Sequence, residues 1–337
     1  MGVNILRIWL CNYFSLSLLT EHSKYMKILL IISILLFASC AKNIGESEKT
    51  IDGNEKGEVL NIPLSRSLQN PAFSPDSRSI VFTRFINGYN REPAEMYKFN
   101  LYTEQLTLLV SDGSANVNLP GSCWNGAIGK ITFSSSRDTH DEIYLIRETG
   151  TTGDEYRITN RPAAAGYEPT LSPDGKWIVF ESHKVDEEEN GIIVKYKTEG
   201  SSSYINLTSA DADCRQPNWS PAGDKILFQK FEDKQWDIWI MNTDGSGKKR
   251  ITFGQGDKTD ASFSNDGQYI VYSCDFESDL ADIYRISVSG GEPVRLTGLA
   301  GYEGAPSVSP DGAKLVCESC KGEPDNSGGT KLIIFEY

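Results

Sequence analysis

The chain has 337 residues, of which 39% are hydrophobic and 10% aromatic, enough to build a substantial core. Its formal net charge of -13 argues against nucleic acid as a partner, because phosphate binding requires clustered Lys and Arg. The acidity mainly favours solubility.

The first 39 residues are typical of a signal peptide with an upstream extension. Lys27 follows Met26, an apolar run extends from Ile28 to Phe37, and small residues precede Cys40. About ten apolar residues are too few to span a bilayer, which needs about twenty. The segment resembles a bacterial lipoprotein signal peptide, which implies cleavage before Cys40 and lipidation of that cysteine. Either Met1 or Met26 is the start.

Residues 40–57 are predicted to be the lipidated cysteine and a flexible tether, because they are polar, charged and poor in aliphatic side chains. Alanine, and not aspartate, follows Cys40. By the usual sorting pattern of such lipoproteins, this implies an anchor in the outer membrane of the cell envelope. Periplasmic and surface-facing orientations both stay open.

A phrase typified by SPDGKWIVF, which begins at Ser172, recurs along the rest of the chain. The turn serine or its counterpart falls at Ser74, Asn125, Ser172, Ser220, Ser264 and Ser309. Successive spacings are therefore 51, 47, 48, 44 and 45 residues. A period of this size is typical of a propeller blade with four strands.

The chemistry within each unit supports four strands. Ser-Pro-Asp-Gly favours a tight turn, so the apolar segments on either side of it are expected to form a hairpin. A third strand begins at an acidic residue, and a short last strand ends in threonine. The acidic residues are Glu95, Glu142, Asp237 and Asp282; we expect them to make a repeated hydrogen bond. The pattern predicts an all-β fold for residues 58–337, a six-bladed β-propeller with four-stranded antiparallel blades.

The two ends of the repeat region predict how the ring closes. The last unit stops after its third strand, at Tyr337, whereas an unassigned strand lies near Glu58 at the other end. We therefore expect the N-terminal strand to complete the sixth blade, which removes exposed strand edges.

The composite phrase of a Trp-Ser-Pro-Asp-Gly turn, an apolar strand, Asp-Ile-Tyr, an Asp-Gly turn and Arg-Leu-Thr resembles the WD-like propeller repeat of the TolB family. The resemblance covers about Glu58 to Tyr337. It implies a periplasmic protein-binding propeller. The α/β domain that precedes the propeller in TolB-like proteins has no counterpart in residues 41–57.

No catalytic, metal or cofactor site is predicted. After Cys40 the chain has two histidines, His140 and His183, which cannot make a three-histidine metal centre. Cys317 and Cys320 have C-x-x-C spacing, but Cys317 occupies the strand position that is Phe180 in the third unit. We interpret both as packed side chains, and the sequence leaves their redox state open.

The candidate binding residues are those at which the repeat varies. The loops that enter the innermost strands are expected to converge around the central channel, at the position three residues ahead of the recurrent aromatic. This position is occupied by Asn70, Gly121, Glu168, Gln216, Asp260 and Ala305. Tyr167 and Arg215 adjoin two of these positions. Polar groups that converge at a cavity mouth form a candidate binding site, so Asn70, Tyr167, Glu168, Arg215, Gln216 and Asp260 are the predicted site. A merely solvated rim is the alternative interpretation.

Together these features predict a monomeric, lipid-anchored scaffold in the cell envelope that binds a protein or glycan. The membrane is contacted through the lipid alone, and no nucleic acid or cofactor is expected. The alternative is a carbohydrate-active enzyme, a lyase or a hydrolase, that uses carboxylates at the channel. Carboxyls about 5 to 9.5 Å apart in a pocket would favour the enzyme.

Overall fold

The computed structural model describes residues 57–111, 113–120, 123–185, 190–199, 203–276, 280–324 and 328–337. The predicted signal peptide, Cys40, the tether up to residue 56 and Gly121 lie outside these residues. Within the described chain no helix is long and apolar enough to cross a membrane.

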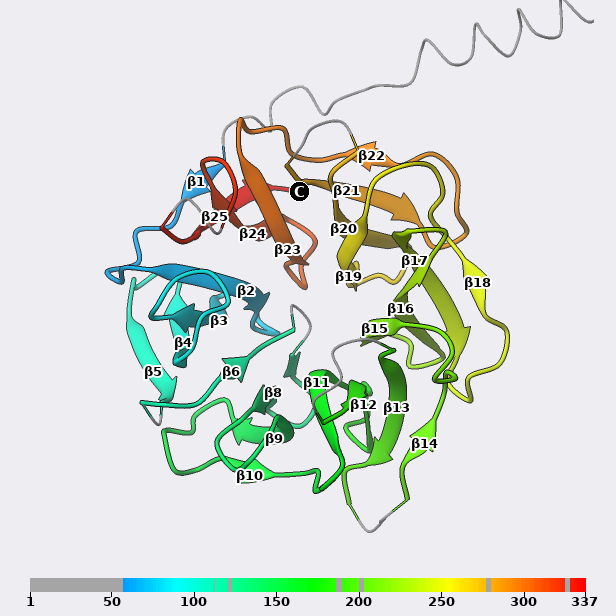
Figure 1. Ribbon diagram of the computed structural model, residues 1–337. Coiled ribbons are helices and arrows are strands. Elements are labelled where there is room, and N and C mark those ends of the chain that lie inside the picture. The colour runs from blue at the N-terminus through cyan, green and yellow to red at the C-terminus, as the bar shows by residue number, and fades with distance from the viewer. Residues whose placement is uncertain are drawn as a thin grey trace, which may run out of the picture. The chain divides into compact units, whose positions relative to one another are not determined.

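The described chain forms six small antiparallel sheets arranged as blades around a ring (Figure 1), which confirms the predicted six-bladed β-propeller. Blade 1 contains β2 (Ser67–Phe73), β3 (Ser79–Phe85), β4 (Ala94–Asn100) and β5 (Leu106–Val110). Blade 2 contains β6 (Val117–Asn118), β7 (Trp124–Asn125), β8 (Lys130–Ser135), β9 (Glu142–Arg147) and β10 (Tyr156–Arg157). Its innermost strand is split, because β6 and β7 both pair with β8.

Blades 3 to 5 are regular. Blade 3 contains β11 (Ala164–Leu171), β12 (Trp177–Lys184), β13 (Ile192–Lys197) and β14 (Ile205–Asn206). Blade 4 contains β15 (Cys214–Trp219), β16 (Lys225–Glu232), β17 (Gln235–Asn242) and β18 (Lys249–Arg250). Blade 5 contains β19 (Lys258–Phe263), β20 (Tyr269–Cys274), β21 (Asp282–Ser287) and β22 (Val294–Arg295).

Blade 6 confirms the predicted closure. It contains β23 (Tyr302–Val308), β24 (Lys314–Cys320), β25 (Lys331–Glu336) and, as its outer strand, β1 (Glu58–Val59). In Figure 1 the blue β1 lies beside the red β25, and Glu58 pairs with Ile334. The Ser67 and Thr330 hydroxyls, 3.0 Å apart, add a second link, between blade 1 and blade 6.

A hydrophobic cluster fills each of the six junctions between neighbouring blades, including the junction of blades 6 and 1. One position of the second strand recurs in these clusters and is buried throughout: Phe82, Phe133, Phe180, Phe228, Tyr272 and Cys317. Burial on both faces explains why these strands are apolar on both faces. Cys317 therefore packs as a core residue, as predicted, and none of the five cysteines in the described chain forms a disulfide.

The strand directions define two faces of the propeller. The turns between first and second strands, with the Ser-Pro-Asp-Gly sequences, lie on what we call the turn face. The loops between second and third strands, and those that lead to the next blade, lie on what we call the loop face. The chain enters blade 6 from the turn face, because β1 starts level with Ile334 and runs towards Leu332.

The acidic residues of the third strands have the predicted structural role. Asp237 accepts a hydrogen bond from Thr252 Oγ1 at 2.8 Å and pairs with Arg250 Nη2 at 2.5 Å. Glu142 accepts bonds from Thr159 and Arg157 in the same way. These contacts tie the short outer strand to the rest of the blade.

Candidate channel-mouth site

In five of the six blades, a β-bulge in the first strand aims one side chain at the channel. In each of these blades the pairing register shifts at this point. The bulged residue has a left-handed φ of 48° to 52° in each: Asn70, Glu168, Gln216, Asp260 and Ala305. These are the positions selected from the sequence, but they lie inside the strands and not in the loops before them. Because the conformation recurs even at Ala305, it is a property of the fold.

Hydrogen bonds join the bulge side chains of neighbouring blades. Asn70 Nδ2 donates to Asn118 Oδ1 at 2.8 Å, and Asn118 Nδ2 donates to Glu168 Oε1 at 3.0 Å. Further round, Gln216 Nε2 donates to Asp260 Oδ1 at 2.9 Å. Asn118, on β6, thus takes the place expected for Gly121. The split first strand of blade 2 explains why the alignment placed this position at Gly121.

Two glutamates on second strands also contact the bulged residues. We call the bulge side chains, Asn118 and these two glutamates the inner ring. The backbone N–H of Asn70 donates to Glu318 Oε2 at 3.1 Å, and that of Gln216 donates to Glu181 Oε2 at 3.0 Å. Both glutamates follow the recurrent core position, as Phe180-Glu181 and Cys317-Glu318. Sequence reasoning missed them; the available signal was a glutamate next to the most buried residue of the strand.

The carboxyls of the ring are electrostatically coupled. Burial raises the pKa of Glu168 well above its usual range, and the charges of Glu181 and Asp260 raise it further. Burial, followed by the charge of Asp260, raises the pKa of Glu318 to about 8. The raised pKa values favour the protonated forms of Glu168 and Glu318, which reduces repulsion between the carboxyls.

Two tyrosines cover Glu318 from the loop face. The hydroxyls of Tyr89 and Tyr302 each lie 3.1 Å from Glu318 Oε1 and 3.1 Å from each other. Tyr89 belongs to the long connection between β3 and β4, so this loop of blade 1 reaches across to blade 6. Burial raises the pKa of both tyrosines, which keeps them as neutral donors.

A cavity of about 610 Å³ opens on the loop face above blades 2 to 4. Four of the predicted site residues line it: Tyr167, Glu168, Arg215 and Gln216. Asn70 and Asp260 instead border a narrower space of about 30 Å³ deeper in the channel, together with Glu168 and Gln216. The six predicted residues thus lie along one connected stretch of the channel.

Charged and aromatic groups share the wall of the wide cavity. Arg215 Nη2 pairs with Asp213 Oδ2 at 2.9 Å, and its guanidinium carbon lies 5.1 Å from the Trp236 ring centre. His183 Nε2 and Glu181 Oε1 are 2.5 Å apart, and the Tyr167 ring packs edge-on to His183. Such a wall can bind charged and hydrogen-bonding groups. In the part of the chain that the structure describes, no group of three His, Cys, Asp or Glu could hold a metal ion.

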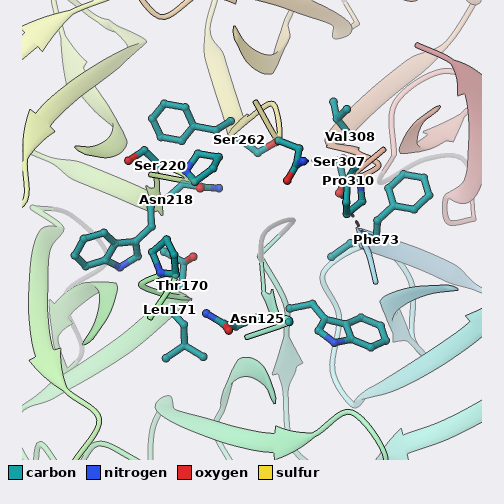
Figure 2. Close-up of a pocket in the computed structure, with 18 of the residues that line it drawn as sticks. Phe73, Asn125, Thr170, Leu171, Asn218, Ser220, Ser262, Ser307, Val308 and Pro310 are labelled. Atoms are coloured by element: carbon teal, nitrogen blue, oxygen red, sulfur yellow. Dashed lines mark hydrogen bonds between the residues drawn. The ribbon is translucent and has the colours of Figure 1, made fainter. Parts of the chain in front are cut away.

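The turn-face end of the channel has a different lining. A cavity of about 330 Å³ is bordered by four recurrent aromatics, Phe73, Trp124, Trp219 and Phe263, and by prolines and serines of the turns. Figure 2 shows Asn125, Asn218 and Ser307, from different blades, around this space. All four aromatics also belong to or pack against the clusters between blades, so their recurrence is explained by packing.

Comparison with known proteins agrees with this geometry. A family model described as the TolB β-propeller domain matches residues 186–328. An uncharacterised protein of Agrobacterium fabrum is 26% identical over 52% of this chain and 58% of its own length. The Tol-Pal system protein TolB of Francisella tularensis subsp. mediasiatica is 33% identical over 51% of this chain and 38% of its own length.

The chain thus spans 58% of the length of the first of these relatives and 38% of the length of the second. Among solved structures, a putative TolB from Agrobacterium tumefaciens superposes with a TM-score of 0.57 at 17% identity, over 77% of this chain and 98% of that one. Likeness at this level of identity shows the fold. Repeat, ring and matches together identify the described chain as a TolB-like six-bladed β-propeller.

Proposed function

We propose that this protein is a scaffold of the bacterial cell envelope that binds a protein or glycan at the loop-face mouth of its channel. Its support is the convergence of Tyr167, Glu168, Arg215 and Gln216 on one cavity of about 610 Å³. These residues are not required by the repeat, because the equivalent positions of other blades carry different side chains. The TolB relatives are consistent with a binding role in the envelope.

The proposal includes a lipid on Cys40 as the sole membrane attachment, in the outer membrane. Its support is the sequence around Cys40. The chain enters the propeller on the turn face, so the loop-face mouth lies on the opposite side of the propeller from that entry. A partner can therefore reach the mouth without displacing the entering strand. A Cys40→Ser variant is expected to move the protein from the membrane fraction to the soluble fraction.

The test is crosslinking capture from whole cell envelope with the full chain, read by mass spectrometry for proteins and glycans. Glu168→Lys combined with Asp260→Lys should reduce recovery of the captured partner at least about tenfold. The control is Glu104→Lys with Glu199→Lys, which replaces two carboxyls by lysine at exposed positions. Equal recovery from both double variants would contradict the proposal.

Lysine in place of Glu168 packs against neighbouring blades and risks unfolding the protein. A second double variant, with neutral substitutions, controls for this. Glu168→Gln with Asp260→Asn removes both carboxyls but keeps the size of each side chain and one oxygen acceptor in each. If this pair retains the melting temperature and still loses the partner, the channel mouth is the binding site. If it binds as the wild type does, the carboxyls are structural only.

The alternative, a carbohydrate-active enzyme, has one observation in its favour. Glu168 and Glu318 have raised pKa values and lie in the field of Asp260, and acid–base catalysis uses carboxyls with separated pKa values. New reducing or unsaturated ends released from envelope or pectic glycans, and abolished by Glu318→Gln, would establish this activity. Binding without turnover would exclude it for those glycans.

A further inference from the structure

Blades 4 and 5 expose a group of aromatic side chains on the loop face, here called the aromatic patch: Phe231, Trp236, Phe253 and Phe276. The exposed fractions of the three phenylalanines are 44%, 70% and 56%. Single exposed apolar residues need no explanation, but several on one face are typical of an interaction surface. None of the four is needed to fill a cluster between blades.

Polar contacts of the backbone hold the segments of the patch together. The Phe231 and Trp236 rings flank the hairpin of β16 and β17, with centres 5.3 Å apart. The Trp236 N–H donates to Asp257 Oδ1 at 2.8 Å, and the Asp257 N–H donates to Asp275 Oδ1 at 2.7 Å. The loop after β18, which carries Phe253, therefore lies between the hairpin and Phe276.

The patch is continuous with the channel-mouth cavity. Arg215 lines that cavity and also lies 5.1 Å from the centre of the Trp236 ring. A ligand that enters the cavity beside Arg215 is thus next to Trp236 and Phe231. One partner of modest length can contact both surfaces.

The chemistry of the patch indicates what binds there. Three of its four rings are phenylalanine, which has no polar group for a sugar hydroxyl and suits aliphatic or aromatic side chains. Its rim carries the exposed carboxylates Asp233, Asp257 and Asp275. Lys234 is exposed in the same hairpin, so the rim remains net negative.

The nearest arginines do not reverse this charge. Arg250 lies over the Phe253 ring, but its Nη2 pairs with Asp237 Oδ2 at 2.5 Å. Arg215 pairs with Asp213 in the same way. A positively charged partner segment is therefore complementary to the rim, in a chain whose net charge is -13.

We propose that the aromatic patch is the docking surface for a partner protein segment in which apolar side chains alternate with Lys or Arg. This rests on the proposed function for the adjoining channel mouth and deepens it by naming the chemistry of the partner. The apolar side chains pack on Phe231, Phe253 and Phe276, and the basic side chains lie against the aspartates of the rim.

The experiment uses a phage-displayed library of random dodecapeptides, panned on the full chain in a mild detergent. Selected peptides are synthesised, and their affinities are measured for the wild type and three variants. Phe253→Ser with Phe276→Ser removes two exposed rings of the patch. Tyr102→Ser is the matched control, because Tyr102 is 72% exposed, also lies under an arginine, and belongs to the turn face. Glu168→Gln with Asp260→Asn tests the channel mouth.

The expected result is enrichment of peptides with Lys or Arg beside apolar residues, whose affinity falls about tenfold or more in the patch variant and is unchanged in Tyr102→Ser. The inference is overturned if no peptides are enriched, if the enriched peptides are acidic, or if they bind the patch variant as tightly as the wild type. If peptide affinity falls only in the Glu168→Gln, Asp260→Asn variant, the peptides bind at the channel mouth and not at the patch. That result supports the proposed function and overturns the inference about the patch. A glycan array signal that requires Phe253 and Phe276 would assign the patch to sugars and overturn the protein assignment.

Discussion

The two ends of the channel differ in which features recur from blade to blade. At the turn face both backbone and side chains recur: a serine, an acidic residue and an apolar strand in nearly every blade. At the loop face the backbone recurs, with a bulged residue near φ 50° in five blades, but the side chains are Asn, Glu, Gln, Asp and Ala. The repeated end is thus explained by folding alone, whereas the varied end requires another explanation.

The turn-face serines show what folding requires. Ser172 Oγ donates to Asp174 Oδ1 at 2.6 Å and accepts the Trp177 N–H at 3.0 Å, which closes the hairpin. Blade 4 has Ala222 in place of that aspartate, and there Ser220 Oγ donates to Asp224 at 2.9 Å instead. The hydrogen bond is retained although the sequence has changed, which marks it as structural.

The largest expected effect concerns the loop-face carboxyls and pH. The pKa of Glu318 is raised to about 8, from an ordinary value near 4.5. The folded state therefore keeps a proton that the unfolded state loses, and the free energy of unfolding falls as pH rises from about 5 to 8. Relative to Glu318→Gln, the wild type should lose on the order of 1 to 3 kcal/mol over this range. Thermal unfolding of both proteins at several pH values measures the difference.

The control for this prediction lies at the other end. Glu104→Gln changes an exposed carboxyl of the turn face and should leave the pH profile of the wild type unaltered. If the wild type and Glu318→Gln show parallel profiles between pH 5 and 8, Glu318 is ionised in the folded protein. The inner ring would then hold more negative charge than the raised pKa of Glu318 indicates.

A turn-face serine gives the next largest effect. Ser264→Ala removes an oxygen that accepts the Tyr269 N–H at 3.0 Å and donates to Asp266 at 2.6 Å. The expected cost is about 1 to 2 kcal/mol, or about 2 to 6 °C in melting temperature. Partner capture should not change. A variant that keeps its stability but loses the partner would show that the turn face is also a binding surface.

The difference between the ends also explains what the sequence could reveal. The blade count, the closing strand and the core role of Cys317 follow from repeated local patterns, because each blade solves the same packing problem. Glu318 was missed because its contacts with Asn70 and Tyr89 depend on the closed ring, which brings blade 1 against blade 6. Glu181 was missed because its contact with Gln216 joins two neighbouring blades. Asn118 was missed because blade 2 departs from the repeat at that point.

The smallest expected effect compares one bridging amide at each end. Asn118→Ala removes the link between Asn70 and Glu168, whereas Asn265→Ala removes a 2.7 Å bond to the Pro310 carbonyl on the turn face. Each should cost about 0.5 to 1.5 kcal/mol of stability. Only Asn118→Ala should weaken partner capture, because it frees Glu168 at the cavity wall and further raises the pKa of that carboxyl. Parallel loss of capture in both variants would mean that capture reports the stability of the ring and not the chemistry of its mouth.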